Sequence, residues 1–321
     1  MKVILVNTEG YKDITQLVTS ITWSGDYQQA ARKLDITVAV SPHDVYLPKV
    51  FIGPGQMLKL QTNDGTELIK SFVFSRQKSY QGTDMQITAY DGLIYLTKSQ
   101  MSYNFKNMTA EAITTKVCND LGIIPGNIIS TGIAQQSYLA QGKTGYEIIM
   151  TAYTAASKQN GKKYLPIMNN GKLDVIEKGA VTASYVLDNG LNLTNATYSD
   201  SLESMVNRVI ITDDKGNTVG KVENAEWMKS YGMIQAIYQR EQGKDANIIA
   251  SGMLKGLERK ASVDALGNIE CITGRAIEIK EPYTGLSGLF FIDSDTHTWQ
   301  NGQYSMNLTV SFQNMMDEKE G

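Results

Sequence analysis

The sequence predicts a mainly β protein with an α+β insert: two β-barrel or sandwich domains with a small α+β domain between them. Short stretches of alternating apolar and polar residues recur about every ten residues near both ends of the chain, with Asn, Asp and Gly between them. Helical patterns with capping residues occupy the middle. Only six prolines occur among 321 residues. We therefore predict β domains at 1–100 and 181–321, and the insert at 101–180.

The first domain is expected to consist of antiparallel strands. Asn63-Asp64-Gly65 is a turn signal between two of them. The predicted strands are 2–7, 17–23, 34–40, 57–62, 67–78 and 85–91.

The insert carries two helices with recognisable ends. Thr109 can cap the first helix, and Gly122 can end it in the left-handed conformation. Thr144 and Glu147 have the spacing of a capping box, which predicts the start of the second. A hairpin is expected around Asn169-Asn170-Gly171.

The last domain is predicted to return to β structure. A hairpin is expected around 213–217, and a further strand at about 233–239. Apolar residues at helical spacing predict a helix at about 245–260, although it contains Gly252 and Gly256. A long strand is expected at 268–280.

A hairpin at 289–312 closes the chain, and its loop length decides which face is buried. A two-residue turn, Asn301-Gly302, would place Asp293, Asp295 and His297 on the core face and bury the two carboxylates without partners, at several kcal/mol per ion. A three-residue loop from Gln300 shifts the register by one. We therefore predict the longer loop, with the acids facing solvent and five other residues facing the core: Phe290, Ile292, Ser294, Thr296 and Thr298.

Composition argues against several classes of function. The net charge of −3 gives no basic surface for specific nucleic-acid binding, and no apolar run is long enough for membrane insertion. Cys118 and Cys271 lie far apart in apolar stretches, which indicates buried free thiols and a reducing compartment.

The chemical motifs have ordinary explanations. Gly142-Lys143-Thr144 resembles part of a phosphate loop, but Ser137 stands where the motif needs glycine, so a helix start is favoured. His297, Asp293 and Asp295 could bind a cation from one strand face, but their residue types also suit a solvated face. Met315-Met316 is expected to close the core, with a contact to a partner protein as the alternative. We predict no catalytic, cofactor-binding or metal site.

Several stretches together resemble the baseplate hub proteins of contractile-tailed phages and phage-tail-like bacteriocins. This is the late control gene D family (late control protein D), in its PBSX-prophage-like branch. The resemblance runs over essentially the whole chain. It rests on several stretches taken together: 71–78 with 85–93, 108–123, 169–173, 243–249 and 285–312.

The resemblance implies a structural protein of the tail. Two tube-like β domains per subunit would form, in a homotrimer, a pseudo-sixfold ring joining the sixfold tail tube to the threefold spike. The implied partners are further copies of the chain, the tail tube protein, the central spike protein and other baseplate proteins. The implied location is the virion or tail-like particle, assembled in the bacterial cytoplasm.

Two alternatives stay open. One is a hub from a non-phage contractile injection system. The other is a tail-associated cell-wall hydrolase or glycan-binding protein. A hydrolase would need a catalytic set, and a glycan-binding protein would favour exposed tryptophans, of which only Trp23, Trp227 and Trp299 are candidates.

Overall fold

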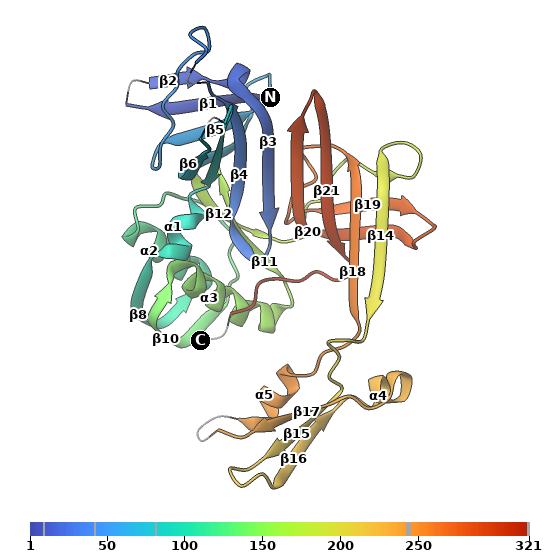
Figure 1. Ribbon diagram of the computed structural model, residues 1–321. Helices are drawn as coiled ribbons and strands as arrows, with labels where there is room; N and C mark the ends of the chain where they lie inside the picture. Colours follow the sequence, from blue (N-terminus) through green and yellow to red (C-terminus); the bar gives the residue numbers. More distant parts are fainter. Residues whose placement is uncertain (9, 42, 81, 242–244, 320–321) are drawn as a thin grey trace. The chain divides into compact units, whose positions relative to one another are not determined.

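The computed structural model describes residues 1–8, 10–41, 43–80, 82–241 and 245–319. The chain forms two compact units, one made of Met1–Ala196 with Ser262–Gly321 and the other of Thr197–Ala261. The mainly β class is confirmed, with several sheets (Figure 1). The sheets are open and do not form the closed barrels that were one of the two expected forms. The division into three domains stays a prediction.

The first unit contains most of the strands. The N-terminal strands are β1 (Lys2–Asn7), β2 (Gly10–Asp13), β3 (Val18–Asp26), β4 (Gln29–Ala39), β5 (Met57–Gln61), β6 (Glu67–Lys78) and β7 (Asp84–Tyr90). A 3-10 turn, Thr15–Leu17, precedes β3. The later strands are β13 (Leu187–Asp188), β19 (Ala276–Glu281), β20 (Leu286–Gln300) and β21 (Gln303–Ser311). Two more, β14 (Leu193–Ser201) and β18 (Glu258–Leu266), run across the boundary between the units.

One sheet joins the beginning and the end of the chain. Its order is β14-β18-β21-β20-β3-β4-β7-β6-β5-β1-β2, with β19 on β20 and β13 on β19. The junction is an antiparallel pairing of β20 with β3, from Ser294 opposite Asp26 to Gln300 opposite Ser20 (Figure 1). The two regions predicted as separate β domains are therefore hydrogen-bonded to each other along this seam.

The middle of the chain is an α+β part with its own core. It contains α1 (Leu93–Lys98), β8 (Gln100–Thr109), α2 (Ala110–Asp120), β9 (Pro125–Ile128), β10 (Ala134–Thr144), α3 (Gly145–Asn160), β11 (Tyr164–Asn169) and β12 (Lys172–Glu177). The predicted helix ends are confirmed: Thr109 caps α2, Gly122 after it has a φ of 67°, and Thr144 and Glu147 form the capping box of α3. Strand β12 pairs with both β11 and β9.

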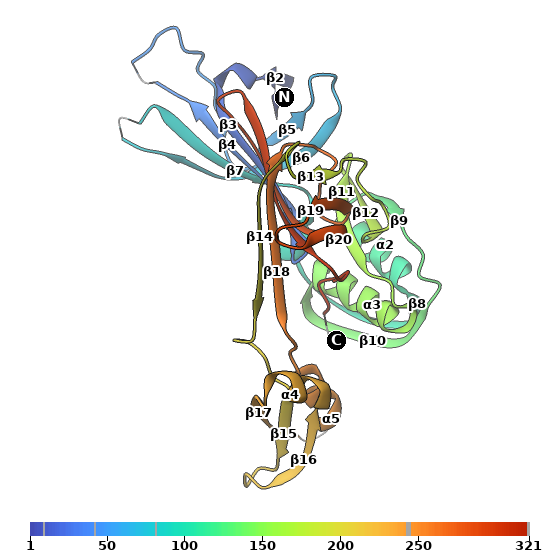
Figure 2. The same cartoon turned by 90° about the vertical axis from the view of Figure 1, so that its right-hand side faces the viewer.

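The tail after β21 packs on this α+β part. Met316 is buried in its core, which confirms that residue as core closure, whereas Met315 is 40% exposed. The Tyr146 hydroxyl donates a hydrogen bond to Asp317, and the Lys319 amide donates one to the Thr154 hydroxyl. Figures 1 and 2 both show the tail that follows β21 reaching α3.

The second unit is a three-stranded sheet with two short helices. Its elements are β15 (Arg208–Thr212), β16 (Thr218–Glu223), α4 (Ala225–Tyr231), β17 (Gln235–Gln239) and α5 (Ala246–Gly252). The predicted hairpin around 213–217 and the strand near 235 are confirmed. Helix α5 packs on β15 and β16.

The helix predicted at 245–260 is wrong in length, because α5 ends at Gly252. The backbone of Lys255 instead exchanges two hydrogen bonds with Val206, which a continued helix would forbid. A β-carbon on Gly256 would come 2.9 Å from the Trp227 ring, so this glycine allows a close approach, whereas nothing lies within 4 Å of Gly252. Residues 243 and 244, part of the stretch that carried the family resemblance, lie outside the described residues.

The closing hairpin has a two-residue turn, and the predicted three-residue loop is wrong. Gln300 pairs with Gln303, and Asn301 and Gly302 have φ values of 53° and 75°. Two consecutive left-handed residues are typical of the type I′ turn, whose twist matches that of the flanking strands.

This turn places the acidic face of β20 in the interior. Asp293, Asp295 and His297 are 5%, 1% and 0% exposed. Phe290 and Ile292 are buried as predicted, but the other three residues expected in the core are only half-buried: Ser294, Thr296 and Thr298. A bulge between Ile292 and Ser294 changes the alternation along the strand.

The strand predicted at 268–280 is also wrong over most of its length. Regular pairing begins only at Ala276, in β19. The preceding segment is a loop in which the side-chain oxygen Oδ1 of Asn268 accepts from the Glu270 amide and the Arg275 guanidinium donates to the Glu270 backbone carbonyl. Residues of this loop form hydrogen bonds with side chains of β20. These bonds take the place of the backbone pairing that a strand would make.

Candidate functional site

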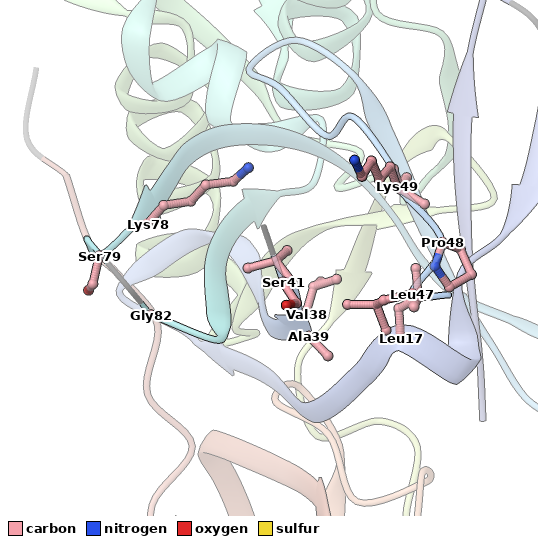
Figure 3. Close-up of a pocket in the computed structure, with 12 residues that line it drawn as sticks. Leu17, Val38, Ala39, Ser41, Leu47, Pro48, Lys49, Lys78, Ser79 and Gly82 are labelled. Atoms are coloured by element: carbon pink, nitrogen blue, oxygen red, sulfur yellow. The ribbon is translucent and has the colours of Figure 1, made fainter. Parts of the chain in front are cut away.

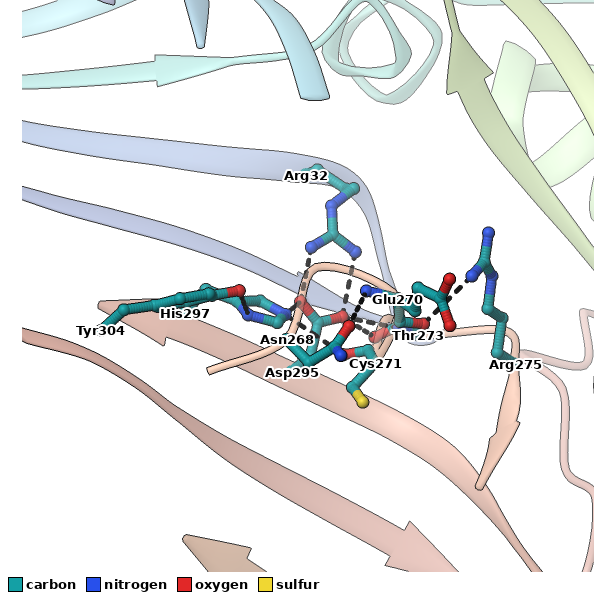
Figure 4. Close-up of polar contacts among 9 residues, drawn as sticks. All are labelled: Arg32, Asn268, Glu270, Cys271, Thr273, Arg275, Asp295, His297 and Tyr304. Carbon is teal, nitrogen blue, oxygen red and sulfur yellow. Dashed lines mark hydrogen bonds and ion pairs between the residues drawn. The ribbon is translucent and has the colours of Figure 1, made fainter. Parts of the chain in front are cut away.

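The candidate site is a buried ionic cluster on β20, built around Asp295. Its Oδ1 accepts from Arg32 Nη1 at 2.9 Å, and its Oδ2 from Arg32 Nη2 at 2.5 Å, so the guanidinium binds both oxygens (Figure 4). The amide and hydroxyl of Thr273 also donate to Oδ1, each at 2.6 Å. Bidentate, charge-assisted pairs of this kind are the strongest hydrogen bonds in proteins.

Aromatic residues surround the guanidinium and the imidazole. Arg32 Cζ lies 4.1 Å from the centre of the Trp23 ring, in cation–π geometry. His297 Nε2 lies 3.3 Å from Asp295 Oδ2 and 3.1 Å from the Cys271 carbonyl oxygen. His297 Nδ1 is 2.9 Å from the Tyr304 hydroxyl. Both ring nitrogens therefore have partners inside the protein.

Gly25 makes room for the ion pair. A β-carbon at this position would lie 2.3 Å from Arg32 Nη1 and 3.2 Å from Asp295 Oδ1. Because a side chain here would displace the guanidinium, the glycine in β3 lets Arg32 of β4 reach across to β20.

A second buried ion pair lies on the same strand. Lys178 Nζ is 2.5 Å from Asp293 Oδ1, with both side chains buried, and lies 4.7 Å from the centre of the Tyr27 ring. The Ser311 hydroxyl donates to the other oxygen of Asp293. Asn314 in the tail donates to the Lys178 carbonyl at 2.6 Å. Lys178 follows β12, so this pair ties the α+β part to β20.

The charged state of the cluster follows from these contacts. Burial alone would raise the pKa of Asp295, but the Arg32 charge and the hydrogen bond with His297 outweigh it and hold that pKa below its ordinary range. Burial lowers the pKa of Lys178, against the opposing attraction of Asp293. Asp91 accepts from the Arg32 and Leu93 amides, yet burial raises its pKa to about 7.

The arrangement is suited to joining segments of the chain. The sequence allowed a cation beside these acids or a solvated face. In the structure the positive charges are supplied by Arg32 and Lys178, and the face is buried, so the solvated-face interpretation is wrong. Within the described residues, no group of three or more His, Cys, Asp or Glu is placed to hold a metal ion.

The other residues considered from the sequence lie apart from the cluster or inside the protein. Thr144 of the Gly142-Lys143-Thr144 stretch caps α3, as predicted. Cys118 and Cys271 are free and buried, as predicted. Trp23 is buried in the cluster, while Trp227 and Trp299 are half-buried. Among the described helices, none has the length and apolar character needed to span a membrane.

Residues 21–311 match the family described as YQBQ-like. The chain belongs to the YQBQ-like family. It is 26% identical over 312 residues to the phage-like element PBSX protein XkdQ of Bacillus subtilis strain 168, with 93% of this chain and 94% of that protein covered. The YQBQ-like chain is thus a relative of a phage-element protein over nearly its full length.

Solved structures show the same fold in tail proteins. The 43 kDa tail protein of prophage MuSo2 from Shewanella oneidensis matches with a TM-score of 0.72 and 18% identity, covering 97% of this chain and 98% of that one. The E. coli c3393 protein, described as a type VI secretion component similar to the T4 tail proteins gp27 and gp5, matches with a TM-score of 0.56 and 10% identity, covering 95% and 76%. The YQBQ-like chain therefore has a phage-tail-protein fold.

Proposed function

We propose that this YQBQ-like protein is a structural baseplate hub of a contractile tail. Three copies would form a pseudo-sixfold ring that joins the sixfold tail tube to the threefold spike. The partners would be the tail tube protein, the central spike protein and other baseplate proteins, in a virion or tail-like particle assembled in the host cytoplasm. In this role the chain is not an enzyme and uses no cofactor.

The observation that carries the proposal is the continuous sheet with its buried ion pairs. A hub must keep its β segments in fixed relation while the tail contracts. The β3–β20 seam joins the two ends of the chain, and Arg32–Asp295 lies across it. Lys178–Asp293 adds a link to the α+β part. The whole-length relation to the phage-element protein supports the same role.

Light scattering on the purified chain, alone and with candidate spike or tube proteins, tests the proposal. A species of three times 35.4 kDa, alone or on adding a partner, would support the hub. A chain that stays monomeric with every tail partner would refute it.

A hub of a non-phage contractile injection system is the second candidate, favoured by the fold shared with the type VI secretion component. Genes for a capsid and DNA packaging next to this gene would favour a phage, and their absence an injection system. A zymogram against bacterial cell walls and a glycan-binding array test the remaining alternative, and activity in either would contradict a purely structural hub.

A further inference from the structure

A pocket of about 390 Å³ opens among the N-terminal strands of the first unit, away from the ionic cluster. Its walls come mainly from two stretches, the end of β4 with the segment after it and the end of β6 with the β6–β7 connection, and Leu17 adds to them (Figure 3). The apolar part of the lining consists of Leu17, Val38, Val40, Leu47, Pro48 and Val50.

Two lysines lie at the rim of this pocket. Lys49 and Lys78 are exposed and line it from opposite stretches, and Figure 3 shows their side chains extending toward each other across the opening. Within the described part of the chain, neither ammonium group has an ion-pair partner. Two converging positive charges above an apolar floor favour a ligand with a carboxylate beside an aliphatic group.

The same two stretches also carry exposed apolar side chains outside the pocket lining. Tyr46 is 92% and Tyr80 94% exposed, and Val45 and Phe51 are also exposed. Tyrosine is enriched at protein interfaces, because its ring supplies contact area at small entropic cost. An apolar, aromatic surface of this kind fits a protein segment better than free phosphate.

We propose that this pocket, which we call the Lys49/Lys78 pocket, binds an acidic–aliphatic peptide segment of a partner protein. An aliphatic side chain of the segment would enter the apolar floor near Leu47. Neighbouring carboxylates of the segment would pair with Lys49 and Lys78. The binding site lies within one copy of the chain and does not depend on trimer formation.

Fluorescence anisotropy with the full chain tests this proposal. The probe is a labelled peptide of alternating Leu and Asp, compared with a Leu/Lys peptide of the same length. We expect the acidic peptide to bind and the basic one not to bind. The double variant Lys49→Glu/Lys78→Glu should weaken binding about tenfold or more, which corresponds to about 1.4 kcal/mol. Leu47→Ser should also weaken it.

The matched control is Lys98→Glu/Lys106→Glu, which changes the net charge equally at exposed lysines of the α+β part. Retained binding in the control, with loss in the pocket variant, supports the proposal. Four results would overturn it: no binding of the acidic peptide up to about 1 mM, equal loss in the control, no effect of Leu47→Ser, or displacement by inorganic phosphate or oligothymidylate as readily as by unlabelled peptide. Circular dichroism of each variant checks that it folds.

Discussion

Removing the Arg32 charge should destabilise the protein far more than removing an exposed lysine. The Arg32 side chain is 13% exposed and Asp295 is fully buried. Breaking a buried pair leaves an uncompensated charge and costs about 3–5 kcal/mol. In Arg32→Met, Asp295 keeps its two hydrogen bonds from Thr273. We therefore expect a loss near the lower end, about 3 kcal/mol.

A double-mutant cycle in urea unfolding, followed by tryptophan fluorescence, measures the pair itself. Arg32→Met, Asp295→Asn and the double variant should give a coupling of about 2 kcal/mol or more. The control cycle uses the Lys33–Asp35 pair, joined at 2.8 Å but with side chains 40% and 36% exposed. Its coupling should stay below about 1 kcal/mol. Equal couplings in the two cycles would refute the reasoning.

The same variants also test the pH dependence of the unfolding free energy. The folded pKa of Asp295 is depressed, so its contribution to stability is present above the unfolded value, about 4, and is lost as pH falls through the folded pKa. The drop in unfolding free energy from pH 7 to pH 3 should therefore be smaller in Arg32→Met than in the natural protein. An unchanged drop would mean that Arg32 does not set that pKa.

Three further predictions concern two glycines, the buried Asp91 and the two cysteines. Gly25→Ala should lower stability by about 1–3 kcal/mol because its β-carbon displaces the guanidinium, whereas Gly252→Ala, with open space around it, should be neutral or slightly stabilising in the same urea assay. Because burial raises the folded pKa of Asp91 to about 7, its contribution to stability is full below about pH 4 and is lost as pH rises to 7. Asp91→Asn should abolish that part of the pH dependence, and an unchanged pH profile would contradict it. Burial raises the thiol pKa of Cys118 to about 11 and of Cys271 to about 12, so iodoacetamide should label both only in denaturant, and rapid labelling of the native protein would count against their burial.

Local features of the fold could be predicted because their causes lie within a few residues. Strand β1 follows from the short apolar run at 3–6, and the starts of α2 and α3 follow from Thr109 and Thr144, whose capping partners lie three residues away. The Asn170-Gly171 turn likewise follows from the two residues that tolerate positive φ. Helix α5 was predicted too long, because its end depends on a pairing with Val206, far away in the sequence.

The candidate site could be predicted only in part. The sequence by itself placed Asp293, Asp295 and His297 on one strand face, since alternation along a strand is local. Which way that face points depended on partners elsewhere: Arg32 is 263 residues from Asp295, and Lys178 is 115 residues from Asp293. Without those cations, burying the two carboxylates would cost several kcal/mol per ion, so the sequence alone predicted that they face solvent. The tertiary structure brings the cations to β20, and the resulting pairs make the inward register and the two-residue turn the stable arrangement.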